Sequence, residues 1–320
     1  MRKAYTLLLF LFLSVPVLAQ ASAYDKDYIG QPETIDAVYE DTFVKIAREH
    51  GLGYVEMRAA NPAVDPWIPG EGTKIVLPTR HLLPNAPKDG IIINLPEMRL
   101  YFFPEDGEPI SLPIGIGRDG LDTPEGDTKI VRKKEGPTWR PTERMREEKP
   151  ELPAAVGPGP RNPLGTHALY LGWPQYLIHG TNKPYGIGRR VSSGCIRLYP
   201  EDIIRLFAEV PVDTPVHVVN QPVKAGWVGE EFYVEIHPLK EEADFLEDNL
   251  PLETTTLSEK EVGYILDKAG DIAEQLDWEK IRQAAAERRG YPVMVGSWHE
   301  SNLTSHQQAM SESYPVIEVR

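Results

Sequence analysis

Cys195 is the only cysteine of this chain and the residue with the clearest potential for chemistry. It lies in the segment Val-Ser-Ser-Gly-Cys-Ile-Arg, residues 191–197. A thiolate is a strong nucleophile, but an unassisted cysteine is mostly protonated at neutral pH and needs a base or a positive neighbour. A lone cysteine is also often a small buried apolar residue, so its neighbours decide between the two interpretations.

His179 is the candidate base. It lies sixteen residues before Cys195, at the end of a predicted strand, and the glycines between them let the chain fold back. A positioned imidazole contributes about 10²–10⁴-fold as an acid–base catalyst. The alternative is a strand-end histidine that is bonded only to backbone.

Gly194 and Arg197 flank the thiol with two further chemical features. Glycine permits a backbone geometry that other residues avoid, so this turn can direct consecutive amide N–H groups at one point. Such donors are worth about 3–4 kcal/mol each to a tetrahedral oxyanion. The planar fork of Arg197 suits a substrate carboxylate, unless it pairs with Glu201 or Asp202. Together these residues predict acyl transfer through a thioester.

Short strands must position these residues, within a predicted domain at residues 89–222. The strands are predicted at residues 91–94, 99–103, 128–131, 168–171, 176–179 and 216–219. Short strands between glycines and prolines favour a sandwich-like or barrel-like β core. One helix is predicted over residues 200–208, because proline and two acidic residues occupy its first turn.

Two regions flank this β domain. Residues 35–80 predict a small α/β module, and residues 24–34 and 81–88 a polar arm and a linker. The module's elements are predicted as a strand, two helices and a strand, at residues 35–39, 42–50, 54–60 and 72–78. The C-terminal extension, residues 223–320, is predicted to be partly helical: Ser258 and Glu261 have capping-box spacing before an apolar stripe that continues to Leu276, and a second helix is predicted over 278–289.

Residues 1–23 have the pattern of a cleavable signal peptide. Arg2 and Lys3 precede an apolar run, and small residues follow, with cleavage predicted after Ala21 or Ala23. The run is too short to span a bilayer comfortably. We therefore expect a soluble periplasmic protein without stable membrane insertion, in a compartment where a cysteine without a disulfide partner is unusual.

Composition and motif spacing argue against several other classes of protein. Without residues 1–23, 32 basic residues remain against 48 acidic ones, a net charge of −16, which argues against a nucleic-acid partner. Residues 115–120 match the GxGxxG pattern of dinucleotide sites, but the proline-containing segment after them cannot open the helix that such a site needs. The eight histidines lack metal-ligand spacing. We therefore expect no metal and no cofactor.

The segments around His179 and Cys195 resemble the L,D-transpeptidase (YkuD-type) catalytic domain over about residues 89–220. The resemblance rests on residues 179–182, 187–188 and 191–198, with support from 123–126, 137–139 and 162–165. Residues 35–80 resemble the LysM module, a family that binds the N-acetylglucosamine backbone of peptidoglycan and chitin. Residues 233–239 and 288–293 resemble the C-terminal extension of the ErfK/YbiS/YcfS/YnhG subgroup.

This resemblance implies a mainly β, sandwich-like catalytic domain with a LysM-like module before it and a partly helical extension after it. It implies an enzyme that attacks a peptidoglycan tetrapeptide stem after its third residue, releases the terminal D-alanine and passes the acyl group to an amine. Cys195 would be the nucleophile and His179 the base. The Gly180 carbonyl would orient the imidazole, and amides near Ser193, Gly194 and Cys195 would form the oxyanion hole.

Ser193 is a departure from the family pattern, because many members have histidine at this position. His179 is therefore the only credible base, and Arg197 and Asn182 are candidate substrate-binding residues. The acceptor stays open at this point: a diaminopimelate amine would give a 3→3 crosslink, a lysine of an outer-membrane lipoprotein would give a tether to the wall, and water would make the protein an L,D-carboxypeptidase. A non-catalytic peptidoglycan-binding protein is the alternative from another class.

Overall fold

The computed structural model of the chain describes residues 24–253 and 255–298. The predicted signal peptide, residues 1–23, and the end of the predicted extension, residues 299–320, lie outside the described residues. None of the helices in the described part has the length and apolarity needed to cross a membrane.

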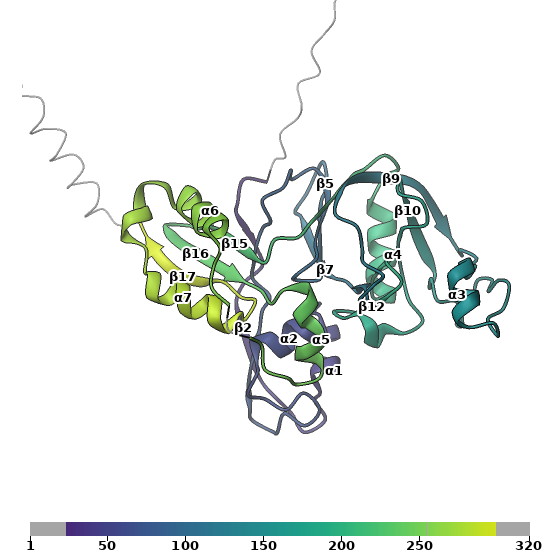
Figure 1. The fold of residues 1–320 in the computed structure, drawn as a ribbon, viewed down its shortest axis with the longest axis horizontal. Helices are drawn as coiled ribbons and strands as arrows, with labels where there is room; N and C mark the ends of the chain where they lie inside the picture. The colour runs from purple at the N-terminus through teal and green to yellow at the C-terminus, as the bar shows by residue number, and fades with distance from the viewer. Residues whose placement is uncertain (1–23, 254, 299–320) are drawn as a thin grey trace, which may run out of the picture.

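A mixed eight-stranded sheet forms the centre of the molecule (Figure 1). Its strand order is β13-β11-β10-β9-β14-β5-β6-β7, with parallel pairing only between β13 and β11 and between β14 and β5. The mainly β catalytic domain is thereby confirmed, and all six predicted strands are present. The strands are β5 (Gly90–Asn94), β6 (Arg99–Phe103), β7 (Ile110–Pro113), β9 (Gly126–Glu135), β10 (His167–Leu171), β11 (Leu177–His179), β13 (Ile196–Arg197) and β14 (Pro215–Val219).

Short elements complete this part of the chain. The helix α4 packs against β10, where the rings of Phe207 and His167 meet at a tilt of 56° with centroids 4.6 Å apart. A short parallel pair, β8 with β12, lies beside the main sheet. The other elements are β8 (Ile116–Gly117), α3 (Glu143–Glu148), η1 (Pro184–Gly186), β12 (Arg190–Ser192) and α4 (Pro200–Glu209).

The N-terminal region has the predicted order strand, helix, helix, strand. Thr42 caps the first helix by accepting a hydrogen bond from the Lys45 amide, and Gly51 follows the helix with a positive φ of 64°. The strands β2 and β3 pair in antiparallel register, and a small pair of β1 with β4 follows the same region. The elements are β1 (Tyr28–Ile29), β2 (Glu33–Asp36), α1 (Phe43–Glu49), α2 (Tyr54–Ala60), β3 (Lys74–Leu77) and β4 (His81–Leu82).

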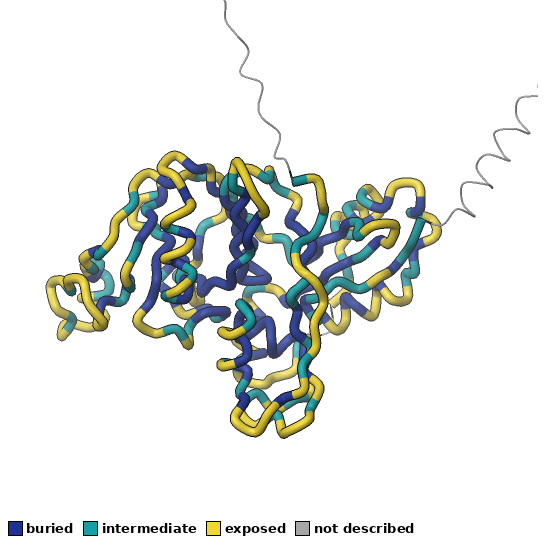
Figure 2. The backbone as a smooth tube through the Cα atoms, turned by 180° about the vertical axis from the view of Figure 1, so that it is seen from behind, coloured by how far each residue is buried: buried dark blue, intermediate teal, exposed yellow. Residues whose placement is uncertain are grey.

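This N-terminal region shares one hydrophobic core with the central sheet. Phe43 and Met57 belong to the same buried cluster as Leu100 and Ile196, and the buried band in Figure 2 runs from the sheet into the helices. The backbones also approach closely, because the Val55 amide donates to the Gly188 carbonyl at 3.1 Å. Gly188 has φ +70°, and a Cβ there would lie 2.3 Å from the Cα of Gly53, so only glycine fits.

The C-terminal extension has its own three-stranded sheet and its own core. Phe232 on the sheet packs with Ile265 and Ile281 on the two helices. The apolar stripe that predicted helix up to Leu276 is interrupted, because Gly270, with φ +57°, ends α6 and a 3-10 segment follows. The elements are β15 (Val223–Val228), β16 (Glu231–Ile236), η2 (Lys240–Glu242), α5 (Ala243–Glu247), α6 (Glu259–Ala269), η3 (Gly270–Gln275), α7 (Trp278–Glu287) and β17 (Val293–Ser297).

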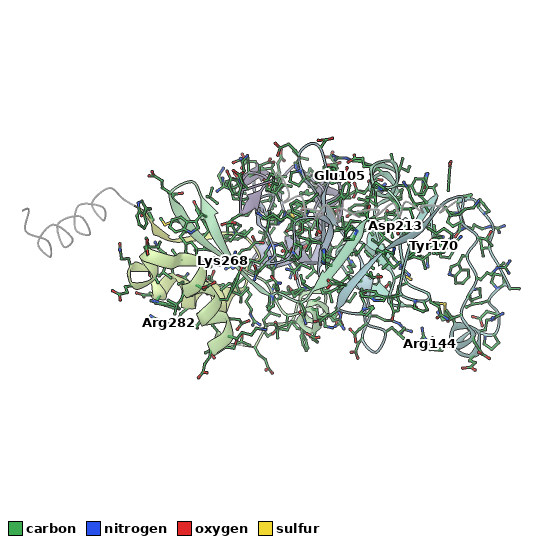
Figure 3. All side chains as sticks on the ribbon, turned by 90° about the horizontal axis from the view of Figure 1, so that it is seen from above. Glu105, Arg144, Tyr170, Asp213, Lys268 and Arg282 are labelled. Carbon is green, nitrogen blue, oxygen red and sulfur yellow. The ribbon has the colours of Figure 1, made fainter. Side chains whose placement is uncertain are left out.

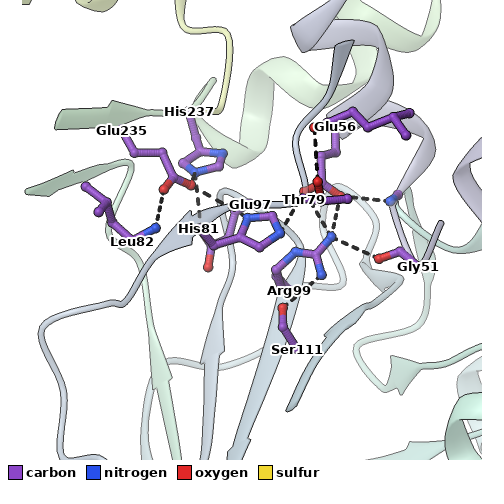
Figure 4. A network of polar contacts seen from close by, with 12 residues as sticks. Gly51, Glu56, Thr79, His81, Leu82, Glu97, Arg99, Ser111, Glu235 and His237 are labelled. Atoms are coloured by element: carbon purple, nitrogen blue, oxygen red, sulfur yellow. Dashed lines mark hydrogen bonds and ion pairs between the residues drawn. The ribbon is translucent and has the colours of Figure 1, made fainter. Parts of the chain in front are cut away.

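A fully buried group of charges joins the linker, the central sheet and the extension (Figure 4). The Lys224 ammonium on β15 contacts Glu97 and lies 2.8 Å from Glu235, and it donates to the Leu82 carbonyl at 2.7 Å. His237 bonds both carboxylates, at 2.7 Å to Glu235 and 3.2 Å to Glu97. Burial alone would raise the pKa of Glu97, but the adjacent ammonium holds that pKa at about 2.

A second buried ion pair continues the group into the N-terminal region. Arg99 on β6 donates to Glu56 on α2 at 2.7 Å and to the Gly51 carbonyl at 3.2 Å. His81 on β4 lies between the two clusters, 3.8 Å from Glu56 and 3.9 Å from Glu235. Buried charges therefore hold together the three regions of the chain.

Removal of the central cation should destabilise the protein strongly. Lys224→Met leaves Glu97 and Glu235 buried beside each other without their counter-ion, and we expect the free energy of unfolding to fall by about 3–5 kcal/mol. Urea denaturation followed by circular dichroism measures this change. The matched control is Lys74→Met, which breaks the exposed pair with Asp36 and should cost less than about 1 kcal/mol. Equal losses in the two variants would contradict the role of Lys224.

Candidate active site

The loop between β12 and β13 carries Cys195. Gly194 precedes the thiol with φ +100°, and a Cβ at this position would lie 2.9 Å from a ring carbon of Tyr176. Positive φ and close contact both require glycine here, as the sequence predicted for the turn. Cys195 itself is half-buried, with its Sγ 3.5 Å from the Gln175 carbonyl.

Hydrogen bonds inside this loop fix its shape. The Gly194 amide donates to Ser192 Oγ at 3.1 Å, and that hydroxyl donates to the Cys195 carbonyl at 2.5 Å. From outside the loop, the buried Thr123 hydroxyl donates to the Gly194 carbonyl at 2.9 Å. The Gly194 amide is therefore engaged within the loop, which leaves the amides of Ser193 and Cys195 as the donors of this turn that can serve an oxyanion.

A chain of charges holds the loop from its other side. Arg190 on β12 is buried and lies 3.2 Å from Asp244 on α5 and 3.8 Å from Asp122. Asp122 belongs to the loop after β8 and lies 3.4 Å from Lys240. The extension therefore contacts the two segments that shape the thiol's surroundings.

The parallel pairing of β11 and β13 brings His179 to the face of the sheet that carries the thiol. His179 pairs with Arg197, and Ile178 pairs with Ile196, whose side chain is buried on the opposite face. Since side chains alternate along a strand, Cys195 and Arg197 share one face with His179. Neighbouring strands thus place the predicted base and the thiol on one face of the sheet.

The Gly180 carbonyl accepts a hydrogen bond from His179 Nδ1 at 2.5 Å. This bond selects the tautomer with hydrogen on Nδ1, so Nε2 keeps a lone pair that can accept a proton. Burial, together with the positive charge of Arg197, lowers the pKa of His179 to about 4. The imidazole is therefore neutral at physiological pH.

Burial also raises the pKa of Cys195, against the smaller opposing effects of the Leu177 backbone and Arg197. These shifts favour a neutral thiol and a neutral imidazole in the same cleft, rather than a thiolate and an imidazolium. A base that removes the proton during attack fits this state.

Arg197 carries a guanidinium without an acidic partner among the described residues. The alternative in which it pairs with Glu201 or Asp202 is wrong for Glu201, which instead binds Arg48 at 2.8 Å. Asp202 does not act on the charge of Arg197 either. Burial lowers the pKa of Arg197, and its Nε is buried without a hydrogen-bond partner. A cation with free donors beside the thiol is suited to bind a carboxylate.

A cleft of about 890 Å³ opens on this face of the sheet. The sheet contributes Arg132, Tyr170, Leu177, His179, Cys195 and Arg197 to its lining. Residues 138–148, which include α3 and are called the lid here, form the opposite wall with Trp139, Arg140 and Arg144. Figure 3 shows Arg144 on α3 and Tyr170 on the sheet at the same end of the molecule.

Asn162 anchors the base of the lid. Its buried side chain donates to the Pro137 carbonyl at 2.6 Å and accepts from the Leu164 amide at 2.9 Å. Residues 137–139 and 162–165 supported the family resemblance in the sequence, but the sequence did not indicate that they support one wall of a cleft. The basic residues Arg140 and Arg144, in an acidic chain, were the signal available for this wall.

The structure does not bring every predicted residue to the cleft. Asn182 is exposed and does not line the cleft, so its prediction as a substrate-binding residue is not supported by this geometry. Ser193 lines the cleft, whereas Gly180 acts through its carbonyl. Residues 115–120 form β8 and a loop rather than a strand-to-helix turn, in accordance with the rejection of a dinucleotide site.

Glu97, Glu235 and His237 are the one group among the described residues with the mutual spacing of metal ligands. The Lys224 ammonium contacts both carboxylates and thus occupies the position of a cation. This group is better described as a buried ion-pair cluster than as a metal centre.

Comparisons with known proteins identify the family of the region that carries this site. Residues 88–218 match the family of the L,D-transpeptidase catalytic domain, YkuD. The chain is 38% identical over 281 residues to the probable L,D-transpeptidase ErfK/SrfK of Salmonella typhimurium, covering 84% of this chain and 88% of the relative. It is 48% identical over 198 residues to the probable L,D-transpeptidase YbiS of Escherichia coli K12, covering 60% and 64%.

A third relative is the probable L,D-transpeptidase YcfS of Escherichia coli K12, with 40% identity over 261 residues, 78% of this chain and 79% of the relative. These similarities extend beyond the catalytic domain into the flanking regions. The chain therefore belongs to the L,D-transpeptidase family, as an enzyme of the ErfK/YbiS/YcfS subgroup with a YkuD catalytic domain.

Proposed function

We propose that the protein is a periplasmic L,D-transpeptidase that acts on peptidoglycan through a thioester on Cys195. The observation that carries this proposal is the common face of the sheet, on which the thiol, a neutral imidazole with a free Nε2 and an unpaired arginine line one large cleft. The export pattern of residues 1–23 supports the compartment.

In the first half-reaction, Sγ attacks the carbonyl carbon of the third stem residue while His179 Nε2 takes the thiol proton. The amides of Ser193 and Cys195 donate to the resulting oxyanion. The C–N bond then breaks, the imidazolium gives its proton to the departing D-alanine amine, and the thioester is left on Cys195. Arg197 binds the carboxylate of that terminal residue in this proposal.

In the second half-reaction, an acceptor amine attacks the thioester and His179 takes a proton from the amine. The C–S bond breaks, and the thiolate is protonated again by the imidazolium. The cleft volume of about 890 Å³ lies near the upper end for ligand sites, which supports binding of a donor stem together with an acceptor. A diaminopimelate amine gives a 3→3 crosslink, and a lipoprotein lysine gives a link between protein and wall.

The LysM-like module contributes glycan binding in this proposal. Two loops of the N-terminal region adjoin, since the Phe43 amide donates to the Pro66 carbonyl at 2.8 Å. They expose Tyr39 (83% exposed), Trp67 (58%) and Ile68 (75%). Exposed aromatic side chains of this kind mark binding surfaces, and sugar rings pack on aromatic faces.

A carbapenem tests the thioester chemistry. The purified protein without residues 1–23 should gain the mass of one carbapenem, because the thiol opens the lactam as it attacks a stem carbonyl. Intact-mass spectrometry measures the adduct, and Cys195→Ala should show none. An absent adduct on the unmodified sequence would favour a wall-binding protein without catalysis.

Two further variants separate the roles in the same assay. We expect His179→Ala to slow acylation by about 10²–10⁴-fold, because no other base faces the thiol. Ser193→Ala keeps the backbone amide and should slow it by less than about tenfold. Comparable losses in both variants would overturn this assignment.

Alkylation by iodoacetamide tests the resting protonation state. Because burial raises the pKa of Cys195 and lowers that of His179 to about 4, the thiolate is a small fraction that grows with pH. Between about pH 6 and 8 the alkylation rate should rise about tenfold per pH unit, in proportion to thiolate. Mass spectrometry over time gives the rate. A rate that stays constant over this range would show a thiolate–imidazolium pair instead.

Binding to insoluble peptidoglycan tests the module. Trp67→Ala should reduce the bound fraction in a sedimentation assay several-fold while carbapenem acylation stays unchanged, since Trp67 lies outside the catalytic cleft. Phe245→Ala, which removes an exposed aromatic ring from α5, is the matched control and should bind as the unmodified protein does. Equal binding by both variants would reject the glycan surface.

A further inference from the structure

We infer that Arg132 and Tyr170 form a carboxylate subsite that selects donor stems with a free acidic group on the amino-terminal side of the scissile bond. This inference rests on the proposed function and specifies the substrate of the same cleft. It begins from a side chain that the catalytic steps above do not use.

The sheet register places this pair in line with the thiol. Tyr170 on β10 pairs with Arg132 on β9 and with Leu177 on β11. Extending the β11–β13 register to the residues before Ile178 and Ile196 sets Leu177 opposite Cys195, in agreement with the interaction between the thiol and the Leu177 backbone. A row of side chains therefore crosses the sheet from Cys195 through Leu177 and Tyr170 to Arg132, and all four line the cleft.

Strand spacing gives the length of this row. Neighbouring strands lie about 4.7–4.9 Å apart, so the β10 position is about 10 Å from that of the thiol. The Arg132 guanidinium lies over the Tyr170 ring, with its carbon 3.5 Å from the ring centroid. The Tyr170 ring thus holds the Arg132 cation over β10, and the N–H groups of the guanidinium remain available at its rim.

Arg132 has no acidic partner in the described part of the chain. Arg144, which also lines the cleft, is bound to Glu148 at 2.5 Å, whereas Arg132 makes only the ring contact. The chain as a whole has a net charge of −14, so an unpaired guanidinium beside the thiol's row is not a consequence of a generally basic surface. A guanidinium with free N–H groups can bind a carboxylate through two parallel hydrogen bonds.

The distance identifies which part of a stem the subsite receives. An extended chain advances about 3.3–3.6 Å per residue, so the backbone of the second stem residue lies one to two residue lengths from the scissile carbonyl of the third, and the reach of its acidic side chain brings a carboxylate to about 10 Å. Arg197 lies on the strand of the thiol itself and takes the terminal carboxylate, so the rest of the donor extends across β11 and β10 toward Arg132. The ligand is therefore an acidic peptide whose carboxylate precedes the diamino acid.

The test compares two synthetic tetrapeptide donors that differ in one group. One carries a free carboxylate at its second residue, and the other carries the corresponding amide. Calorimetric titration of the Cys195→Ala protein measures binding without turnover, and steady-state release of D-alanine by the protein with its thiol measures KM and kcat. We expect about tenfold tighter binding of the acid donor, which corresponds to one charge-assisted bond.

Variants of β9 assign the preference to the side chain. Arg132→Gln should abolish the preference for the acid donor, because the binding affinity for that donor should fall about tenfold while kcat and the affinity for the amide donor stay unchanged. Arg132→Lys should restore the preference in part. Lys134→Gln is the matched control, because Lys134 is an exposed cation of the same strand that does not line the cleft.

The outcomes separate this inference from the proposed function. The subsite is overturned if the preference for the acid donor persists in Arg132→Gln. It is also overturned if the proteins that keep Arg132, with and without the Cys195→Ala change, show no such preference. A preference that depends on Arg132 in binding, without any release of D-alanine, retains the subsite and overturns the proposed reaction.

Discussion

The structure depends most on one buried ammonium group. Lys224 contributes a positive charge from the extension, Glu97 a negative charge from the central sheet, and Leu82 a carbonyl from the linker. Each of these groups would be costly to bury alone, so each requires the others to be in place. Arg99 and Glu56 extend the same requirement to the N-terminal region. The three regions are consequently held in one arrangement by charge neutralisation as well as by apolar burial.

The active site depends on that arrangement because its supports come from all three regions. Gly188, between His179 and Cys195 in the chain, lies against α2 of the N-terminal region. Asp244 and Lys240 of the extension contact Arg190 and Asp122, next to the thiol loop. His179 lies on β11, and Cys195 directly precedes the adjacent parallel strand β13. The flanking regions thus contribute to the position of the nucleophile.

The sequence predicted the strands of the central sheet, the cap at Ser258 and the α2 bounds, because each depends on local pattern. The family was predicted from a distinctive motif, and the roles of His179 and Cys195 stay predictions. The sequence did not predict the strands of the extension, where β15 reads Val-Lys-Ala-Gly-Trp-Val and carries a buried lysine where the pattern requires an apolar residue. The buried charge cluster and the row of side chains from Cys195 to Arg132 could not be predicted from the sequence either, since both depend on pairing between segments far apart in the chain. Asn182 shows that membership of a motif does not place a side chain in the cleft, because it is exposed and lies outside the lining.

The neutral state of Cys195 also bears on the durability of the enzyme. Peroxides and disulfides react with thiolates far faster than with thiols, and overoxidation to sulfinic or sulfonic acid is irreversible. A low-pKa cysteine would be vulnerable wherever reducing systems are scarce. Burial raises the pKa of the Cys195 thiol, which keeps the sulfur mostly protonated, so the desolvation that leaves His179 neutral also makes this thiol less prone to oxidation.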